Sequence, residues 1–447
     1  MIDSAAPPSA MSQPNADDPS TMDPGPSRVG PLSGIRVLEM GQLIAGPFAG
    51  TLLSYFGADV IKLEPPGEGD PLRGWRVVRD GTSLWWRSLA RNKRCITVDL
   101  RREAGQAIAR QLATRCDVVI ENFRPGTVEK WRLGPDDIKA QNPGVIYARV
   151  SGYGQSGPYA HKPGYAAVCE GMGGLRYVTG YPGQPPVRPN LSLGDSLAGL
   201  HAALGILLSL YHRDRSTDGK RNGSGQVVDV AIYEAVFNMM ESVLPEFDGA
   251  GIVRERAGST VTGIVPSNTY RCQDGQYVLI GGNGDSIWRR LMNAAGRPDL
   301  ATDPRLSSNA GRVQHEAEVD AAIAAFTQTL PVSEVVARLE AAGVPVGTMY
   351  SAADIANDPH YQARQMFEAV EVDGRSLKLP AIVPKLSETP GATQFPGPAL
   401  GAHTADVLRD LLGYSDADLD ALAQDGVIDL PVPGRVPGSA TRPPKGP

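Results

Sequence analysis

A single carboxylate stands where an apolar helix is predicted to begin. Asp195 follows Gly194, and the periodic apolar positions after it are Leu197, Leu200, Leu204, Leu207, Leu208 and Tyr211. Their spacings of three and four residues predict one buried helix face, and the helix macrodipole favours an ionised carboxylate at its start. A carboxylate nucleophile needs that charge together with nearby backbone N–H donors. Two interpretations of Asp195 stay open: it is a nucleophile, or it only caps the helix, as most aspartates at helix starts do.

A second segment concentrates positive charge and indole rings between residues 73 and 94. It holds one acid, Asp80, together with Arg73, Trp75, Arg76, Arg79, Trp85, Trp86, Arg87, Arg91, Lys93 and Arg94. Lysine and arginine hold phosphates by charge-assisted hydrogen bonds, and indoles offer stacking surfaces. Because the whole chain has a net charge of −6, this basic cluster favours an ADP-bearing ligand over nucleic acid or an anionic membrane. A solvated basic face with buried tryptophans is the alternative interpretation.

From residue 31 onward, short apolar strands alternate with helical segments, which predicts a parallel α/β sheet. We expect strands at 35–40, 59–64, 96–100, 117–121, 145–150 and 225–230. Ligands of such sheets collect at the carboxyl ends of the strands, here the loops 41–47, 65–70, 122–126 and 151–157. The last loop contains a GxGxxG pattern, but Pro158 follows it where a dinucleotide-binding helix should begin. We therefore do not expect NAD binding there.

Length and composition set further limits. A chain of 447 residues is expected to form two lobes. Cys95, Cys116, Cys169 and Cys272 are widely spaced without a CxxC pair, which indicates reduced thiols in a cytoplasmic protein. The scattered histidines predict no metal site, and we expect no apolar run that approaches the length of a membrane span, about 20 residues.

A series of short motifs resembles, in identity and order, the class III (CaiB/BaiF) coenzyme A transferase family. The matches run from about residue 31 to about 425, and together they are far more specific than any one alone. They are Leu32–Glu39, Ala45–Pro47, Gly57–Glu64, Gly69–Asp70, Asn92–Arg94, Glu121–Gly126, Ser151–Gly154, Pro163–Tyr165, Gly194–Asp195 and Gly401–Thr404.

The resemblance implies an α/β fold in which a Rossmann-like large domain carries an inserted smaller α/β domain, and in which two chains form an interlocked homodimer. The large domain is then expected at 31–226 and 375–425, and the small domain at 250–350. Residues 227–249 and 351–374 are expected as linkers. Residues 1–30, rich in Pro, Ser and Asp, are predicted to be a disordered and dispensable leader, and 426–447 a loose tail.

The resemblance also implies the chemistry. Asp195 is the expected nucleophile, forming an acyl anhydride and then an aspartyl-CoA thioester. Contacts with CoA are implied for Leu43, Ile44, Ala45, Lys93, Arg94, Asn122, Phe123, Lys130 and Tyr153, with oxyanion donors expected near Ile44 and after Asp195. Coenzyme A and acyl-CoA are substrates in this scheme, so no tightly bound cofactor is expected. The other expected partners are small carboxylic acids and a second copy of the chain.

Departures from the family pattern bear on the acceptor acid. Ile44 stands where oxalate-specific members carry a polar residue, and residues 258–263 replace their run of glycines. These differences favour a larger acceptor, such as the C4–C6 dicarboxylates succinate, malate or itaconate, with succinyl-CoA or another short acyl-CoA as donor. Arg188 precedes Asp195 closely and is a candidate partner for a remote carboxylate, although an exposed loop arginine is equally consistent with its position.

Two other functions are weighed against transfer. Acyl-CoA racemases of the same fold carry a His–Asp pair after the residue that corresponds to Gly164, where this chain has Tyr165 and Ala166. A tyrosine, with an ordinary pKa of about 10, is a poor base at neutral pH, so racemisation is the runner-up. A binding protein without catalysis is the weakest alternative, because it requires Asp195 to be only a cap.

Overall fold

The computed structural model describes residues 30–215 and 223–430. Its main element is a six-stranded, wholly parallel sheet, as the sequence predicts. In spatial order the strands are β5 (Lys93–Thr97), β2 (Asp59–Glu64), β1 (Arg36–Glu39), β6 (Val118–Glu121), β7 (Ile146–Ser151) and β8 (Val227–Ala231). Counted along the chain this is the order 3-2-1-4-5-6 of doubly wound α/β folds, which reverses between β1 and β6.

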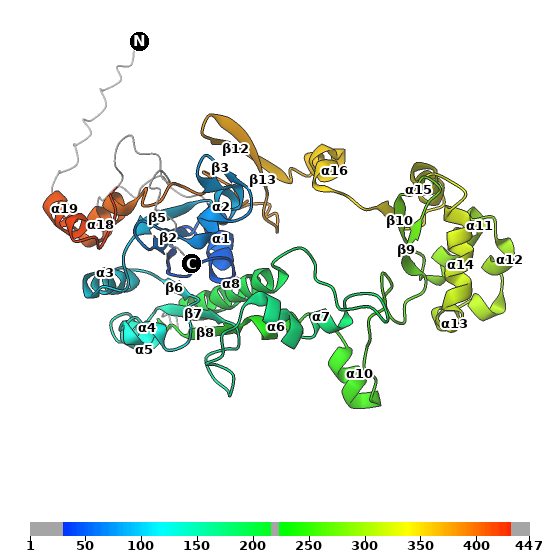
Figure 1. Ribbon diagram of the computed structural model, residues 1–447, viewed down its shortest axis with the longest axis horizontal. Helices are drawn as coiled ribbons and strands as arrows, with labels where there is room; N and C mark the ends of the chain where they lie inside the picture. The colour runs from blue at the N-terminus through cyan, green and yellow to red at the C-terminus, as the bar shows by residue number, and fades with distance from the viewer. Residues whose placement is uncertain (1–29, 216–222, 431–447) are drawn as a thin grey trace, which may run out of the picture.

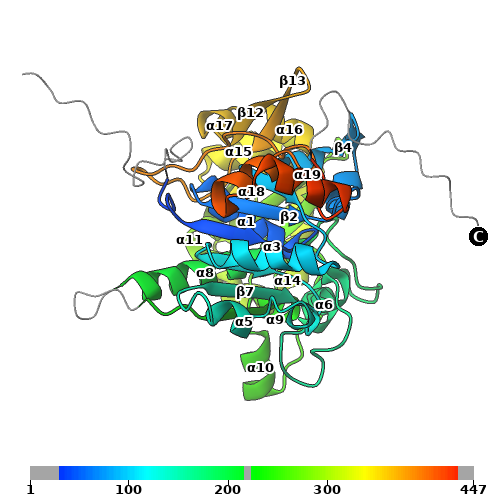
Figure 2. The same cartoon turned by 90° about the vertical axis from the view of Figure 1, so that its left-hand side faces the viewer.

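Both faces of the sheet are buried, which explains why apolar residues stand at successive positions of its strands, as at Val118, Val119 and Ile120. Side chains that point to one face, such as Leu38 and Ile61, join a core with α3 (Glu103–Ala113), α18 (Thr404–Leu412) and α19 (Asp416–Gln424). These helices lie in front of the sheet in Figure 2. The alternate side chains, such as Val37 and Val60, join a second core against the opposite helices. Those are α1 (Ala45–Tyr55), α6 (Ala166–Met172), α8 (Leu193–Asp214) and α9 (Ile232–Phe237).

Two expected boundaries are wrong. Strand β8 pairs with β7 in the main sheet, so residues 227–231 belong to the sheet and not to a linker. Residues 426–430 are not a loose tail, because Val427 and Ile428 are buried in the core beside α18 and α19, and Asp429 accepts and donates backbone bonds with Thr97. The predicted leader up to residue 29 and the predicted tail from 431 lie outside the described residues.

A second group of elements has a core of its own, centred on Trp288, Leu291 and Ile323. Its antiparallel sheet has the order β11 (Val346–Thr348), β10 (Tyr277–Gly281), β9 (Ser267–Arg271). Its helices are α11 (Asp285–Ala294), α12 (Pro298–Ala301), η2 (Pro304–Leu306), α13 (Asn309–Gln314), α14 (Glu316–Thr327) and α15 (Val332–Ala341). Figure 1 shows this group standing apart from the main sheet, joined to it by extended segments near α10 and α16.

Shorter elements complete the described chain. They are η1 (Pro71–Gly74), β3 (Val78–Arg79), β4 (Thr82–Ser83), α2 (Leu84–Leu89), α4 (Thr127–Lys130), α5 (Pro135–Lys139), α7 (Leu175–Val178), α10 (Val243–Ala250), α16 (Ala352–Asn357), α17 (Pro359–Ala363), β12 (Phe367–Val372) and β13 (Arg375–Pro380). Helices α16 and α17 and strand β12 occupy most of the segment 351–374 that was expected to be a linker. The β12–β13 hairpin returns the chain toward the main sheet, where Tyr55 donates a hydrogen bond of 3.0 Å to Glu368.

Helix α8 buries a different face from the leucine face that the sequence predicts to be buried. Its buried face is built from small residues, among them Ala198, Gly199 and Ala202. A Cβ at Gly199 would lie 2.6 Å from the carbonyl oxygen of Ala45, so the small residues let α8 approach α1 closely. The leucine face is open instead, since the exposed fractions are 51% for Leu200, 53% for Leu204, 41% for Leu207, 60% for Leu208 and 61% for Tyr211.

In the described part of the chain, α8 is also the one helix long and apolar enough to cross a membrane, with 22 residues and a mean hydropathy of 1.5 in its most apolar window. The expectation of no such run is therefore wrong. Its small-residue face is packed on α1 and the main sheet within the fold, which is the usual setting of an apolar core helix in an α/β domain.

Candidate active site

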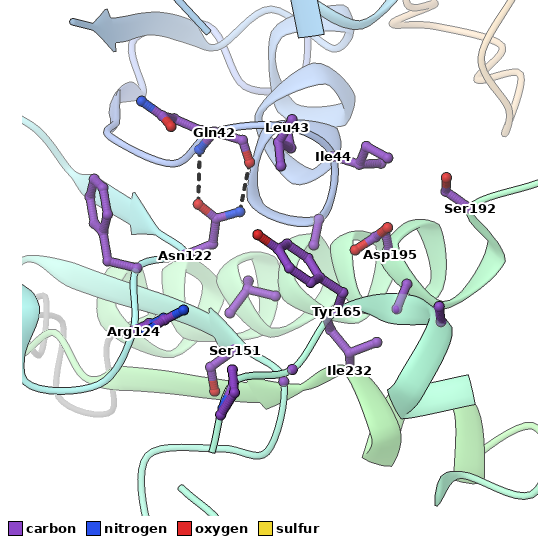
Figure 3. A pocket seen from close by; sticks show the side chains of 18 of the residues that line it. Gln42, Leu43, Ile44, Asn122, Arg124, Ser151, Tyr165, Ser192, Asp195 and Ile232 are labelled. Carbon is purple, nitrogen blue, oxygen red and sulfur yellow. Dashed lines mark hydrogen bonds between the residues drawn. The ribbon is translucent and has the colours of Figure 1, made fainter. Parts of the chain in front are cut away.

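A cavity of about 520 Å³ opens at the carboxyl ends of the central strands, where the strand order reverses. Doubly wound sheets bind their ligands at this point. The walls come from the loops after β1, β6 and β7 and from the starts of α1, α6 and α8 (Figure 3). The lining includes Gln42, Leu43, Ile44, Ala45, Trp75, Asn122, Phe123, Arg124, Ser151, Lys162, Tyr165, Arg188, Ser192, Asp195 and Ile232.

The loops after β1 and β6 are joined by one amide side chain. Asn122 accepts a hydrogen bond of 2.8 Å from the backbone N–H of Gln42, and its Nδ2 donates one of 2.7 Å to the Gln42 carbonyl (Figure 3). A Cβ at Gly41 would lie 2.8 Å from Oδ1 of Asn122, so only glycine permits this approach. The pair fixes the position of residues 43–45, which form the upper wall of the cavity in that view.

A buried charge network supports the same loop from behind. Glu39 accepts from Nζ of Lys93 at 2.8 Å and from Nζ of Lys62 at 3.1 Å, and Lys62 also pairs with Asp70 at 3.0 Å. All four side chains are at most 1% exposed. The network ends on the loop: Nζ of Lys93 donates to the Pro47 carbonyl at 2.6 Å, and Asp70 accepts the backbone N–H of Leu43 at 3.1 Å.

Asp195 occupies the first turn of α8, with its carboxylate on the cavity side between Tyr165 and Ser192 (Figure 3). The N-cap position belongs to Ser192, three residues earlier, so the interpretation of Asp195 as the cap is wrong. Across the described residues, we find no hydrogen bond that holds the Asp195 carboxylate. Its oxygens therefore remain available to attack an electrophile bound in the cavity.

Burial raises the pKa of Asp195 to about 6, and the neighbouring Glu170 carboxylate adds to this shift while Arg188 opposes it. The helix dipole, which was expected to keep this pKa low, is outweighed by desolvation. At neutral pH the group is still mostly ionised, since neutral pH lies above its pKa. A carboxylate with a pKa near 6 is also more basic than an exposed aspartate, which favours attack on a thioester.

Glu170 on α6 lies directly behind the start of α8. It is fully buried and accepts the backbone N–H of Gly194 at 3.2 Å. Two arginines neutralise it: Nε of Arg176 lies 3.3 Å and Nε of Arg188 lies 3.0 Å from Oε2. This cluster therefore positions the turn that carries Asp195 and sets the charge around it.

Six of the ten residues expected at the site line this one cavity: Leu43, Ile44, Ala45, Asn122, Phe123 and Asp195. The other four do not line it. Tyr153 lies behind the wall, its ring 6.3 Å from that of Tyr159, and Lys130 is exposed at the end of α4. The Nζ of Lys93 is bound within the buried network. Arg94 pairs at 2.9 Å with Asp59, which stands at the amino end of β2, away from the cavity.

Three cations of the basic cluster at 73–94, Arg73, Lys93 and Arg94, are thus corrected from phosphate ligands to partners in internal ion pairs. Arg73 binds Glu64 at 2.7 Å and lies over the Trp86 ring, and Arg91 donates to the Pro380 carbonyl at 2.7 Å. Buried charged groups require internal partners; Glu64 of β2 provides one for Arg73, and the β12–β13 hairpin provides those of Arg91. Of the cluster, Trp75 reaches the cavity.

Other cavity residues were missed. Arg124 and Lys162 contribute positive charge to the lining, and Tyr165, considered before only as a replacement for a racemase base, lines the cavity with 73% of its surface exposed. Arg124 follows the Asn122–Phe123 motif directly, so the motif itself could have indicated it. Glu170 could not be predicted in this way, because a single acid in a short helix does not indicate which backbone N–H its carboxylate will accept.

Comparison with known proteins agrees with this geometry. The model of CoA-transferase family III matches residues 32–404. The succinyl-CoA–D-citramalate CoA-transferase of Chloroflexus aurantiacus is 48% identical over 400 residues, covering 89% of this chain and 98% of that protein. The succinyl-CoA–L-malate CoA-transferase alpha subunit of the same organism is 40% identical, covering 94% and 97%.

A solved structure extends the likeness to the fold. A CaiB/BaiF family protein from Brucella suis superposes with a TM-score of 0.75 at 31% identity, covering 86% of this chain and 100% of that one. The family expected from the order of the sequence motifs is therefore confirmed. The chain belongs to CoA-transferase family III, enzymes that move coenzyme A from an acyl-CoA to a carboxylic acid.

Proposed function

We propose that this CoA-transferase takes coenzyme A from succinyl-CoA, or another short acyl-CoA, and passes it to a C4–C6 dicarboxylic acid through a thioester on Asp195. The observation that carries the proposal is the carboxylate of Asp195, which lies free of hydrogen bonds from the described residues in a cavity at the strand switch point. The activities in the names of the two relatives above support these substrates, since both pair succinyl-CoA with a dicarboxylate.

The proposed reaction proceeds by four acyl transfers. The Asp195 carboxylate attacks the donor thioester carbonyl, the C–S bond breaks, and CoA leaves as a thiolate from a mixed anhydride. The thiolate then attacks the aspartyl carbonyl of the anhydride and releases the donor as its carboxylate. The acceptor carboxylate attacks the carbonyl of the resulting aspartyl-CoA thioester, and its C–S bond breaks to give a second mixed anhydride and the CoA thiolate. The thiolate finally attacks the acceptor's acyl carbon, which forms the new acyl-CoA and releases the Asp195 carboxylate. Covalent catalysis of this kind divides one exchange into easier steps.

Each tetrahedral intermediate carries an oxyanion that needs N–H donors. Helix α1 begins at Ala45, which lines the cavity and lies against α8, and the first N–H groups of a helix have no partner within it. The N–H groups of Ala45 and Gly46 are therefore our proposed donors. The Leu43 N–H already donates to Asp70, so Leu43 is proposed only to form part of the cavity wall.

Coenzyme A is proposed to enter along the loops after β1 and β6. Leu43, Ile44, Ala45, Asn122 and Phe123 keep their proposed contacts because they line the cavity. Arg124 and Lys162 replace Lys93 and Arg94 as proposed partners of the negatively charged part of CoA, because both line the cavity and are positively charged. Since CoA is the substrate, the proposal includes no resident cofactor.

The runner-up, racemisation, needs a base for an α-proton. The positions after Gly164 hold Tyr165 at the cavity and Ala166 at the start of α6, and an alanine carries no base. This keeps transfer as the preferred function, with racemisation as the competing outcome of the experiment below.

The function is tested by incubating the enzyme in D₂O with succinyl-CoA and a panel of unlabelled mono- and dicarboxylic acids, and separately with a 2-methylacyl-CoA. We expect new thioesters of C4–C6 dicarboxylic acids, detected by mass, and no deuterium at the α-carbon of the 2-methylacyl group. Transfer changes bonds only at the carbonyl, whereas a racemase must exchange the α-hydrogen with solvent. Rapid α-deuteration without new thioesters would reverse the assignment.

We also propose that the chain acts as a homodimer with the interlocked, two-domain arrangement, in the cytoplasm. The support is the open leucine face of α8, which leaves large apolar side chains exposed in a single chain, as interfaces between subunits do. The corrected large domain runs to about residue 237 and resumes near 375, with the small domain near 250–350 between them. Sedimentation equilibrium of the purified chain should give twice the monomer mass, and a monomer would refute the arrangement.

A further inference from the structure

Arg188 is held in the cavity wall by a buried carboxylate. Its Nε and Nη2 lie 3.0 and 3.2 Å from the two oxygens of Glu170, which is fully buried. The guanidinium is planar, so two bonds along one edge fix the direction of the remaining edge. Arg188 nevertheless lines the cavity beside Asp195, with 35% of its side chain exposed. An arginine fixed before the ligand arrives loses little entropy on binding.

The charge balance of the cluster changes during the proposed reaction. Arg176 and Arg188 contribute two positive charges, and Glu170 and Asp195 contribute two negative charges, so the free enzyme is balanced here. When Asp195 becomes an anhydride or a thioester, its negative charge disappears and one positive charge remains uncompensated. A substrate that brings its own carboxylate to this place restores the balance in the covalent states.

We propose that Arg188 recognises the remote carboxylate of a dicarboxylic acyl group while the near carboxyl carbon reacts at Asp195. The inference rests on the proposed transfer through Asp195 and adds the group that selects dicarboxylic over monocarboxylic acids. Arginine suits this role because its fork matches the geometry of a carboxylate. Glu170 acts as a positioning residue, which holds Arg188 with its carboxylate and the α8 start through Gly194.

The other cations of the cavity are placed differently. Arg124 lies near Ser151, on the far side of the cavity from Asp195 in Figure 3, beside the loop assigned above to CoA. Nζ of Lys162 lies 3.5 Å from the centre of the Tyr159 ring. Among the basic side chains that line the cavity, Arg188 is the one whose charge lowers the pKa of Asp195.

The test compares acceptors that differ only in the remote carboxylate, succinate with butyrate and malate with 3-hydroxybutyrate, using succinyl-CoA as donor throughout. In a ping-pong reaction, kcat/KM for the acceptor reports only the second half-reaction, so effects on the donor cancel. In Arg188→Gln we expect the preference for the dicarboxylate to fall roughly 10- to 100-fold, the usual range for a lost charge-assisted hydrogen bond. In Arg188→Lys, which keeps the positive charge beside Glu170, the preference for the dicarboxylate should fall less.

Arg176→Gln is the matched control, because Arg176 binds the same Glu170 oxygen but does not line the cavity. It should leave the dicarboxylate preference within about twofold of the wild type, whatever it does to stability. An unchanged preference in both Arg188 variants, or an equal loss in Arg176→Gln, overturns the inference. Failure of the proposed function is a separate outcome, since the wild type would then transfer no CoA to either acid of a pair.

Discussion

Asp195→Asn is expected to lower kcat/KM for CoA transfer by a factor on the order of 10³ or more, because the amide cannot form the anhydride or the thioester. The folded protein should survive. The Asp195 side chain makes no hydrogen bond with the described residues, and its charge is disfavoured by burial and by Glu170. At pH 7 the substitution removes that unfavourable charge, so the melting temperature should stay the same or rise slightly. Transfer is measured by the mass of new thioesters, and stability by thermal unfolding.

Two further variants serve as controls for this result. Asp195→Ala excludes activity regained by deamidation of the asparagine, and it should be equally inactive. Asp214→Asn removes a carboxylate at the other end of the same helix, where it pairs with Arg213, and it should retain transfer. If Asp195→Ala keeps more than a trace of turnover, or if all three variants lose activity together, Asp195 is not the nucleophile.

Lys93→Met is expected to destabilise the protein by on the order of 3 kcal/mol, because it leaves part of the Glu39 charge buried without a partner. Lys93 is fully buried and bonds both Glu39 and the Pro47 carbonyl. Lys130→Met is the matched control, since Lys130 is exposed on α4, and surface changes usually stay within about 0.5 kcal/mol. Denaturant unfolding of the two variants measures the difference.

A second readout separates this structural role from phosphate binding. If Lys93 held a phosphate, Lys93→Met would reduce the preference of the enzyme for succinyl-CoA over succinyl-pantetheine, which lacks every phosphate. We expect that preference ratio to change by less than about threefold, since Nζ is turned into the network and not into the cavity. A collapse of the ratio with unchanged stability would restore the phosphate assignment.

The sheet and the loops that converge at the site were predictable because their signals are local. Strands buried on both faces, such as β6 with Val118, Val119 and Ile120, carry apolar residues at successive positions whatever the rest of the chain does. Once the strands are parallel, the loops at 41–47 and 122–126 meet at one edge. The hydrogen bonds between Gln42 and Asn122 at this edge follow from that topology.

The face of α8 was not predictable from periodicity. The spacing of residues shows which of them share a helix face, and the leucines of α8 do share one. It does not show whether that face is buried or exposed. In this chain the close approach to α1 selects Ala198, Gly199 and Ala202 for the inside. The leucine face is exposed in the described chain, and spacing alone does not distinguish an exposed apolar face from a buried one.

The basic cluster at 73–94 shows a signal that was present and not used. Glu39, Asp59 and Glu64 stand within strands β1 and β2 of the main sheet, where a buried carboxylate must find a cation. Arg36 and Lys62 of the same strands supply part of this positive charge, and the structure also pairs Lys93, Arg94 and Arg73 of the cluster with those three acids. Counting acids inside strands would have predicted ion pairs instead of a phosphate site.

The central claim, that Asp195 accepts the acyl group and CoA, is tested most directly by trapping. The wild type is incubated with succinyl-CoA and hydroxylamine, digested, and the peptide that contains Asp195 is examined by mass spectrometry. We expect a hydroxamate at Asp195, with the carboxyl OH replaced by NHOH, only when the acyl-CoA is present, because only an activated aspartyl carbonyl reacts. An unmodified Asp195 peptide from an enzyme that loses no activity, or a hydroxamate on another carboxylate of the cavity, would contradict the account.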